Sequence, residues 1–244
     1  MKTKIIFIAI VIALASGAVS AQSVTMLNPK KVTYKRPKPL MDFKKTFTIT
    51  YPRVKAATPA LSKKIEAILS YEKIFDFTLK EEMTTIQWLE NADYAVNYNA
   101  NKMLAIELTL EGSGAYPSST TKYIVVNIAN GTRVRPADIF VNTSGLLAKL
   151  SKMRDEEVAK KTAEIKADPE TKDDDVSTLF ADSATYQKVT LDQFQPDEGG
   201  IVFHHDYGFP HVAQALQPDG QFFLNWEELK PFIKKGGLLA RFVS

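Results

Sequence analysis

The middle of the chain alternates between apolar and polar positions, which is the pattern of a β-strand with one buried face. The stretch Met103–Glu111 divides into two sets that point to opposite faces, Ile106, Leu108 and Leu110 against Glu107, Thr109 and Glu111. One face of this sheet is therefore expected to be wet or functional. Similar patterns predict further strands at Phe43–Tyr51, Tyr94–Asn99, Lys122–Ala129, Thr132–Arg135, Thr190–Phe194, Ile201–His205 and Gln221–Asn225.

Short polar segments join these strands in sequence, which predicts hairpins and hence an antiparallel meander. Asn130-Gly131 is expected to form a two-residue type I′ turn, because both residue types tolerate positive φ. The run PDEGG at residues 196–200 predicts another hairpin. The predicted sheet does not require the residues of the loop at 112–117, GSGAYP. This loop is therefore the first place where we expect a recognition surface.

Apolar residues at helical spacing predict helices on both sides of the strands. The first helix is expected to begin at Thr58-Pro59, because threonine caps a helix and proline fits its first position. A second is predicted over about Lys73 to Glu90, a third from Thr143 or Ser144 to about Ile165, and a short closing helix in WEELKPFI. This order predicts an α+β fold, in which an antiparallel β meander packs against helices.

Residues 1–21 have the composition of a secretory signal peptide. Lys2 and Lys4 precede the uncharged run Ile5–Ala15, and small residues lead to a predicted cut after Ala21. The apolar run is too short to span a membrane, which takes about 20 residues. We therefore expect a periplasmic or secreted protein with no integral membrane segment after cleavage.

Residues 22–42 contain KKVTYKRPKP and are interpreted as a basic, extended linker. A solvated arm is the favoured interpretation, and contact with an anionic wall or membrane surface is the alternative. The formal net charge of the whole chain is +3, of which Lys2 and Lys4 supply two. This near-neutral balance argues against nucleic-acid binding. The chain has no cysteine, so no disulfide supports its core.

All three histidines lie in the run FHHDYGFPH, as His204, His205 and His211. Imidazole together with the carboxylate of Asp206 suits zinc and other divalent ions. On a strand, His204 and His205 point to opposite faces, whereas His204 and Asp206 share one. The set His204, Asp206 and His211 is therefore the candidate site of a metal-dependent hydrolase, and surface histidines at a strand end are the favoured interpretation.

Other candidate chemistry is weaker. Glu107 and Glu111 are about 13 Å apart on one strand face, too far for a glycosidase pair. Residues 173–175 are three aspartates without the alternation of a calcium loop. No nucleophile motif or phosphate-binding loop is present, so no catalytic residue and no cofactor is predicted. Aromatic residues in or beside loops suit a sugar or a protein partner, or simply close the sheet ends: Tyr116, Tyr207, Phe209 and Trp226.

Three runs together resemble a known family. These are NYNANKMLAIELTLEGSGAYPSSTTKYIVVNIANGTRVRPADIF, DQFQPDEGGIVFHHDYGFP and FFLNWEELKPFI. Their order and spacing resemble the extracytoplasmic domains of the lysozyme-responsive anti-sigma factor RsiV, which carry domain of unknown function 3298 (DUF3298) and an associated N-terminal part similar to that of the deacetylase PdaC. The similarity covers roughly Phe43 to Ile233.

The resemblance implies two interlinked subdomains, an N-terminal PdaC/RsiV-type part at residues 43–117 and an RsiV-like domain at 118–244. It also implies a non-catalytic binding module of the cell envelope, whose partner is peptidoglycan glycan or a muramidase such as lysozyme. The family's contact loops fall on Ser113, Tyr116, His205, Asp206 and Tyr207. The metal-dependent hydrolase at His204, Asp206 and His211, acting on wall polymers, is the alternative.

Overall fold

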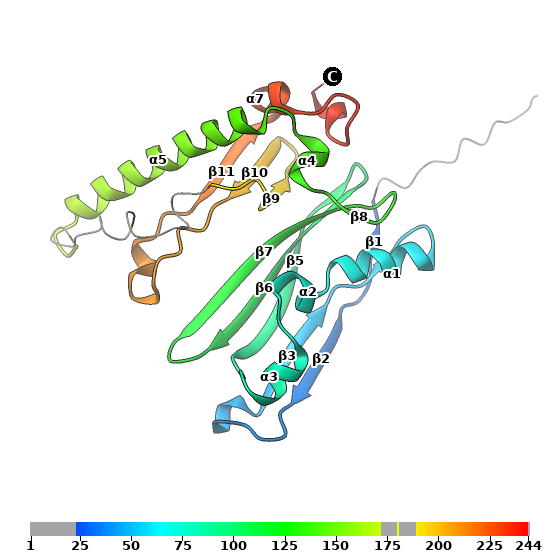
Figure 1. The fold of residues 1–244 in the computed structure, drawn as a ribbon, viewed down its shortest axis with the longest axis vertical. Coiled ribbons are helices and arrows are strands. Elements are labelled where there is room, and N and C mark those ends of the chain that lie inside the picture. The colour runs from blue at the N-terminus through cyan, green and yellow to red at the C-terminus, as the bar shows by residue number, and fades with distance from the viewer. Residues whose placement is uncertain (1–22, 172–179, 181–188, 244) are drawn as a thin grey trace, which may run out of the picture.

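The computed structural model describes residues 23–171, 180 and 189–243 (Figure 1). The expected signal peptide at 1–21 and the aspartates at 173–175 lie outside the described residues. Within the described ranges, no helix is both long and apolar enough to cross a membrane.

A six-stranded sheet runs through the molecule. Its strands in spatial order are β2 (Lys30–Lys35), β3 (Thr46–Tyr51), β5 (Leu89–Ala100), β6 (Met103–Ser113), β7 (Pro117–Asn127) and β8 (Thr132–Arg133). The predicted meander from β5 to β8 is confirmed, because each of these strands pairs antiparallel with the next. The pair β3–β5 is parallel, since the helices between these strands cross over from one end of the sheet to the other.

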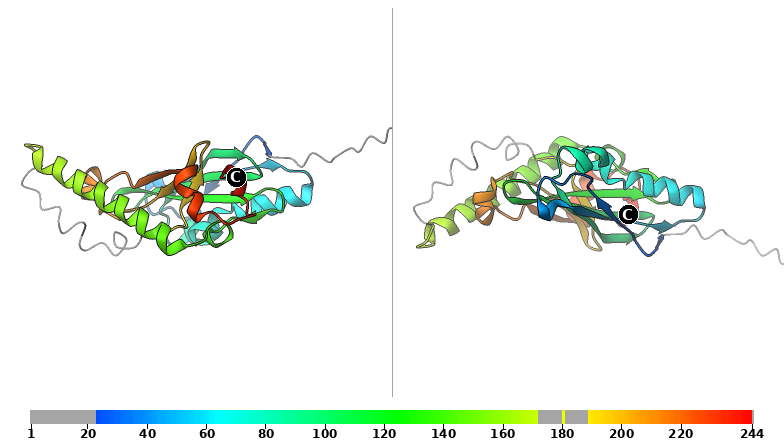
Figure 2. Two further views of the ribbon diagram at one scale, coloured as in Figure 1. Left: turned by 90° about the horizontal axis from the view of Figure 1, so that it is seen from above. Right: turned by 90° about the horizontal axis from the view of Figure 1, so that it is seen from below.

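The second part of the molecule is a smaller sheet covered by a long helix. Its strands β9 (Phe194–Pro196), β10 (Gly200–His204) and β11 (Gln221–Asn225) are antiparallel, which confirms the hairpin at PDEGG. The helices are α4 (Pro136–Ile139), α5 (Thr143–Ala167) and α7 (Trp226–Leu229), with the short 3-10 helices η2 (His211–Leu216), η3 (Lys230–Phe232) and η4 (Ala240–Phe242). Figure 2 shows α5 extending beyond the strands, on the side away from α1.

Two hydrophobic cores lie on opposite faces of β6 and β7. Leu104 and Ile106 belong to the core beneath the N-terminal helices, whereas Met103 and Ala105 belong to the core of the smaller sheet and α5. Because side chains alternate along a strand, the same two strands serve both cores. The α+β class, with antiparallel strands packed against helices, is confirmed. The boundary expected after Pro117, however, falls inside the β6–β7 hairpin, and β7 continues the sheet of the N-terminal part.

The N-terminal helices differ from expectation after the first. Helix α1 (Pro59–Ile68) begins as predicted, with the Thr58 hydroxyl accepting from the Leu61 N–H. The single helix predicted from Lys73 to Glu90 is wrong. The chain instead forms α2 (Tyr71–Phe75) and α3 (Leu79–Thr84), and β5 has begun by Leu89. Asp76 ends α2 in the left-handed region, at φ 53°, and the Thr78 side chain caps α3.

The two-residue turn predicted at Asn130-Gly131 is also wrong. Strand β7 ends at Asn127 and β8 begins at Thr132, so the connection has four residues. Of the two turn residues only Gly131 has positive φ, at 62°, and its N–H donates to the Asn127 carbonyl at 2.8 Å. The positive φ of Gly131 is the feature that favours glycine here, and a Cβ would also come within 2.9 Å of the Leu61 side chain of α1.

Residues 22–42 do not form the linker expected from their charge. Residues 25–26 form β1 and pair with β4 (Val54–Lys55), and β2 pairs with β3 along its whole length. The Tyr34 ring stacks on Phe47, with centroids 4.9 Å apart. Alternating apolar residues in KKVTYK are enough for a strand with one buried face, and the lysines occupy its exposed positions.

Candidate binding cleft

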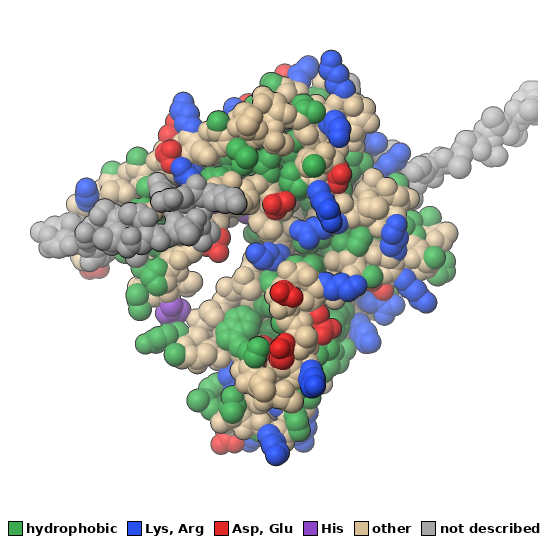
Figure 3. All heavy atoms as spheres, in the orientation of Figure 1, with side chains coloured by type: hydrophobic (Ala, Val, Ile, Leu, Met, Phe, Trp, Pro, Cys, Tyr) green, Lys and Arg blue, Asp and Glu red, His purple; other side chains and the backbone are tan. Residues whose placement is uncertain are grey.

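A polar cleft of about 390 Å³ separates β7 from the smaller sheet. Residues 119–123 of β7 line one side, and residues from 204–209 and 214–221 line the other, together with Gln193. Figure 3 shows a hollow between the two parts of the molecule in this region. The side chains that line the cleft are mostly neutral amides and hydroxyls, so the site offers directed hydrogen bonds rather than a strong charge.

The β7 side of the cleft continues into the polar face that the alternation of β6 predicted. Thr109 lies opposite Thr121, and their hydroxyls are 3.0 Å apart. On the same face, Glu107 lies opposite Tyr123 and Glu111 lies opposite Ser119. Glu111 is exposed and Glu107 and Thr109 are partly exposed, so the expectation that this face is wet is confirmed.

A stacked pair of rings forms one end of the cleft. The imidazole of His204 lies on the Tyr123 ring, with centroids 3.5 Å apart and planes within 7°. The Nε2 atom of His204 is buried and has no hydrogen-bond partner among the described residues. Burial lowers the pKa of His204 to about 4 and, together with Glu107, raises that of Tyr123 to about 12. Both rings are therefore neutral at physiological pH.

The opposite wall is held in place by a carboxylate from α5. Glu157 accepts a hydrogen bond from the Tyr207 hydroxyl at 2.6 Å and from the Gly220 N–H at 3.2 Å. Gly220 has φ 66° and its carbonyl accepts from the His205 N–H at 2.7 Å. A Cβ at Gly220 would lie 2.0 Å from the His205 carbonyl oxygen, so only glycine allows the two segments to approach.

Replacing Glu157 with glutamine should therefore destabilise this wall. Glutamine keeps the shape but loses the charge, and charge-assisted hydrogen bonds are the stronger kind, so we expect a loss of about 1 kcal/mol. Urea unfolding measures it. The matched control is Glu156→Gln, because Glu156 lies in an exposed pair, with its Oε1 3.7 Å from the Lys152 Nζ. Equal stability of the two variants would contradict the role given to Glu157.

A contact between two loops closes one end of the hollow. Tyr116, at the tip of the β6–β7 hairpin, stacks on His211 at the start of η2, with centroids 5.2 Å apart and planes within 16°. Tyr116 is 61% exposed, so the outer face of its ring is available to a ligand. The fold thus places together two candidates from different sets, Tyr116 of the family's contact loops and His211 of the metal set.

The remaining binding candidates lie in different environments. The ring of Tyr207 is fully buried and His205 is 8% exposed, so neither presents a free surface, although His205 and Asp206 both line the cleft. The Ser113 hydroxyl and carbonyl both accept hydrogen bonds from the Lys44 ammonium at 2.8 Å. Ser113 therefore connects the end of β6 to Lys44. The Glu90 carboxylate accepts hydrogen bonds from the Lys44 ammonium and the Ser113 hydroxyl, and these two bonds hold the pKa of Glu90 below its usual value.

The metal-ligand set is not assembled. His204 stacks on Tyr123 and His211 stacks on Tyr116, at different ends of the cleft region. Among the described residues, no three histidine, aspartate or glutamate side chains are grouped as a metal site requires. Four glutamines that line the cleft were not among the sequence candidates: Gln193, Gln214, Gln217 and Gln221. They come from the segment before β9, from η2 and its end, and from β11, so only the fold brings them together.

No family model matches the chain, and no curated protein matches it in sequence. Solved structures do match its fold. A DUF3298 family member from Bacteroides fragilis NCTC 9343 has a TM-score of 0.56 at 12% identity, over 92% of this chain and 99% of that one. The chain has the fold of a DUF3298 protein. A second such protein, from Pseudomonas aeruginosa PAO1, has a TM-score of 0.54 at 14% identity, over 89% of this chain and 97% of that one.

Proposed function

We propose that the chain is a non-catalytic binding protein of the cell envelope and that the polar cleft holds peptidoglycan glycan. The observation that carries the proposal is the lining of the cleft, where amide and hydroxyl side chains from two sheets converge beside neutral rings. A glycan strand presents hydroxyls, acetamido groups and flat C–H faces. Amides and hydroxyls bond the first two, and aromatic faces pack on the third.

The proposed location in the cell envelope is inferred from two features of the sequence. The composition of residues 1–21 supports export, and the resemblance to the RsiV-like and PdaC-like domains supports an extracytoplasmic role. The same resemblance supports a muramidase such as lysozyme as the alternative partner, because an exposed aromatic at a loop tip also suits a protein interface. Tyr116 is that residue.

Purified peptidoglycan sacculi and soluble peptidoglycan fragments provide the direct test. We expect the chain to co-sediment with sacculi and to give a calorimetric titration with fragments. Tyr116→Ala should weaken fragment binding about two- to tenfold, because an aromatic stacking contact contributes about 0.5–1.5 kcal/mol. Gln221→Leu should weaken it as well, because the change removes an exposed amide from the cleft at nearly constant size.

The matched control is Phe223→Ala. Phe223 is an aromatic residue on β11 that is 46% exposed and does not line the cleft, so its removal should leave fragment binding unchanged. Absence of binding to both sacculi and fragments would refute the glycan proposal. If the chain then binds lysozyme and Tyr116→Ala weakens that complex, the partner is a protein.

A further inference from the structure

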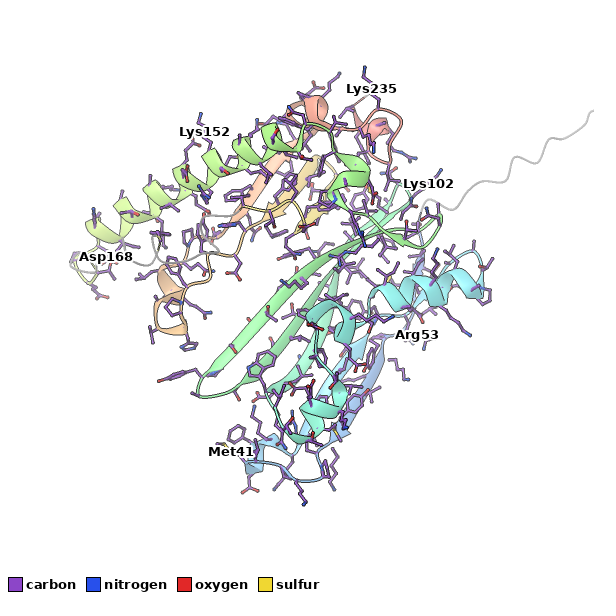
Figure 4. The ribbon with its side chains drawn as sticks, viewed as in Figure 1. Met41, Arg53, Lys102, Lys152, Asp168 and Lys235 are labelled. Carbon is purple, nitrogen blue, oxygen red and sulfur yellow. The ribbon has the colours of Figure 1, made fainter. Side chains whose placement is uncertain are left out.

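Four large apolar side chains are exposed together at the end of the molecule farthest from α7. Three are in the loop between β2 and β3, where Leu40 is 68% exposed, Met41 56% and Phe43 64%. The fourth is Ile86, which is 53% exposed and comes directly before a residue that binds this loop. We call these four residues the apolar tip. Figure 4 shows Met41 at the opposite end of the molecule from Lys235.

The apolar tip is held in a fixed shape. Gln87 is buried, and its side chain accepts from the Leu40 N–H at 2.9 Å and donates to the Lys38 carbonyl at 2.8 Å. On the other side of the tip, the Lys44 N–H donates to the Met41 carbonyl at 2.9 Å. The bonds from buried Gln87 fix the backbone of this loop, so the loop has a defined conformation. The fold therefore presents these apolar side chains to solvent instead of folding them inward.

Exposed basic residues flank the tip in the sequence. Lys35 and Lys38 precede Leu40, and Lys45 follows Phe43. Asp42 is the acidic residue within the loop, and its Oδ1 lies 2.9 Å from the Lys45 Nζ. Lys44 is buried, and its charge is taken up by Glu90 at 2.6 Å. Lys35 and Lys38 are thus left as positive charges beside an apolar surface.

We propose that the apolar tip docks the protein on an anionic lipid bilayer. Apolar side chains would enter the boundary between headgroups and acyl chains, while the lysines bind the lipid phosphates. This combination favours a bilayer over a wall polymer, because a polysaccharide or polyol phosphate has no apolar phase for Leu40, Met41 and Phe43. Exposed apolar patches of this kind mark interaction sites.

The docked protein would also keep a defined orientation. The Lys44 ammonium, which lies just behind the tip, donates to the carbonyl of Ser113 at 2.8 Å. Ser113 ends β6 directly before the turn that carries Tyr116. Lys44 therefore connects the apolar tip to this end of the hairpin, and the cleft would lie at a defined height above the bilayer.

Vesicle flotation tests the proposal with the purified, exported protein. We expect the protein to float with vesicles of phosphatidylcholine and phosphatidylglycerol, and to bind pure phosphatidylcholine vesicles more weakly. The triple variant Leu40→Ser, Met41→Ser and Phe43→Ser should reduce binding to anionic vesicles at least about tenfold. Lys35→Gln with Lys38→Gln should reduce binding and remove most of its dependence on phosphatidylglycerol and on salt.

The matched control replaces exposed apolar residues elsewhere, Val212→Ser with Phe223→Ser, and should bind vesicles as the wild type does. All variants share the same N-terminus, so any vesicle binding by that segment is the same in each of them. In a separate variant, Phe43→Trp, we expect the tryptophan fluorescence to shift to the blue on adding anionic vesicles. Equal vesicle binding by the triple variant and the wild type would overturn the proposal.

A loss of binding to sacculi, but not to vesicles, in the triple variant would also overturn it, in favour of a wall polymer. The glycan proposal is tested separately, because Tyr116→Ala should keep full vesicle binding.

Discussion

Replacing Arg36 with methionine should lower the free energy of unfolding by about 3–5 kcal/mol, the range for breaking a buried ion pair. The Arg36 side chain is completely buried, and its Nη2 lies 3.5 Å from the Glu82 carboxylate. It also donates to the carbonyls of Glu82 at 2.8 Å, Lys44 at 2.9 Å and Leu89 at 2.6 Å. A fourth bond goes to the Thr46 carbonyl at 3.3 Å. Methionine fills much of the space but leaves the carboxylate and four carbonyls without this donor.

Chemical unfolding of the purified protein measures this loss, and circular dichroism at several temperatures confirms it. The matched control is Arg53→Met. Arg53 bonds Glu66 at 2.9 Å, but its side chain is 44% exposed, so we expect a change below about 1 kcal/mol. A small loss for Arg36→Met, comparable to that of the control, would show that water or another cation replaces the guanidinium.

Lowering the pH from 7.5 to 4.5 should cost about 2 kcal/mol of stability through His204 alone. The pKa of His204 is about 4 in the folded protein and 6.5 in its ordinary state. Above pH 6.5 the ring is neutral in both states and contributes no pH dependence. Between pH 6.5 and 4 the unfolded chain takes up a proton that the folded protein does not, so the free energy of unfolding falls as the pH falls.

A pKa difference of one corresponds to about 1.4 kcal/mol of stability. The His204 ring keeps some contact with solvent, which reduces the expected loss of stability to about 2 kcal/mol. The test compares the wild type with His204→Phe, which keeps a ring against Tyr123 but cannot titrate. Urea unfolding at both pH values should show a smaller loss for the variant. Carboxylates such as Glu90 also titrate, but they do so in both proteins and cancel in the difference. Identical pH dependence would contradict the assignment to His204.

The sequence predicts the meander well because its signals are local. Strict alternation in β6 and the cap at Thr58 each depend on a few neighbouring residues, and both appear in the structure as predicted. The errors occur where apolar spacing or a turn motif suggests one conformation and single residues allow another. The helix expected after Lys73 breaks at Asp76, a residue type that tolerates the left-handed region, and the connection at Asn130-Gly131 has four residues instead of two.

The candidate cleft could be predicted only in part. The polar face of β6 and β7 is visible in the alternation, but its partner wall lies 70 or more residues away in the sequence, as the bond from the Tyr123 N–H to the Gln193 side chain illustrates. Tyr207 illustrates the opposite error, because an aromatic beside a loop glycine suggests a contact residue, yet Glu157 draws its hydroxyl into the interior. Charge misled the interpretation of residues 22–42, since β2 pairs along its length with β3 and Arg36 is only 2% exposed.

The basic run on β2 has a further consequence. This strand forms one edge of the six-stranded sheet, and in the described part of the chain no strand pairs with its outer side. Unpaired edges invite strands of neighbouring molecules, and natural proteins discourage this with lysine and proline. Lys30, Lys31 and Lys35 are exposed along β2, and Pro37 follows its end. The same charges that resemble a flexible tether thus protect the sheet from aggregation at its open edge.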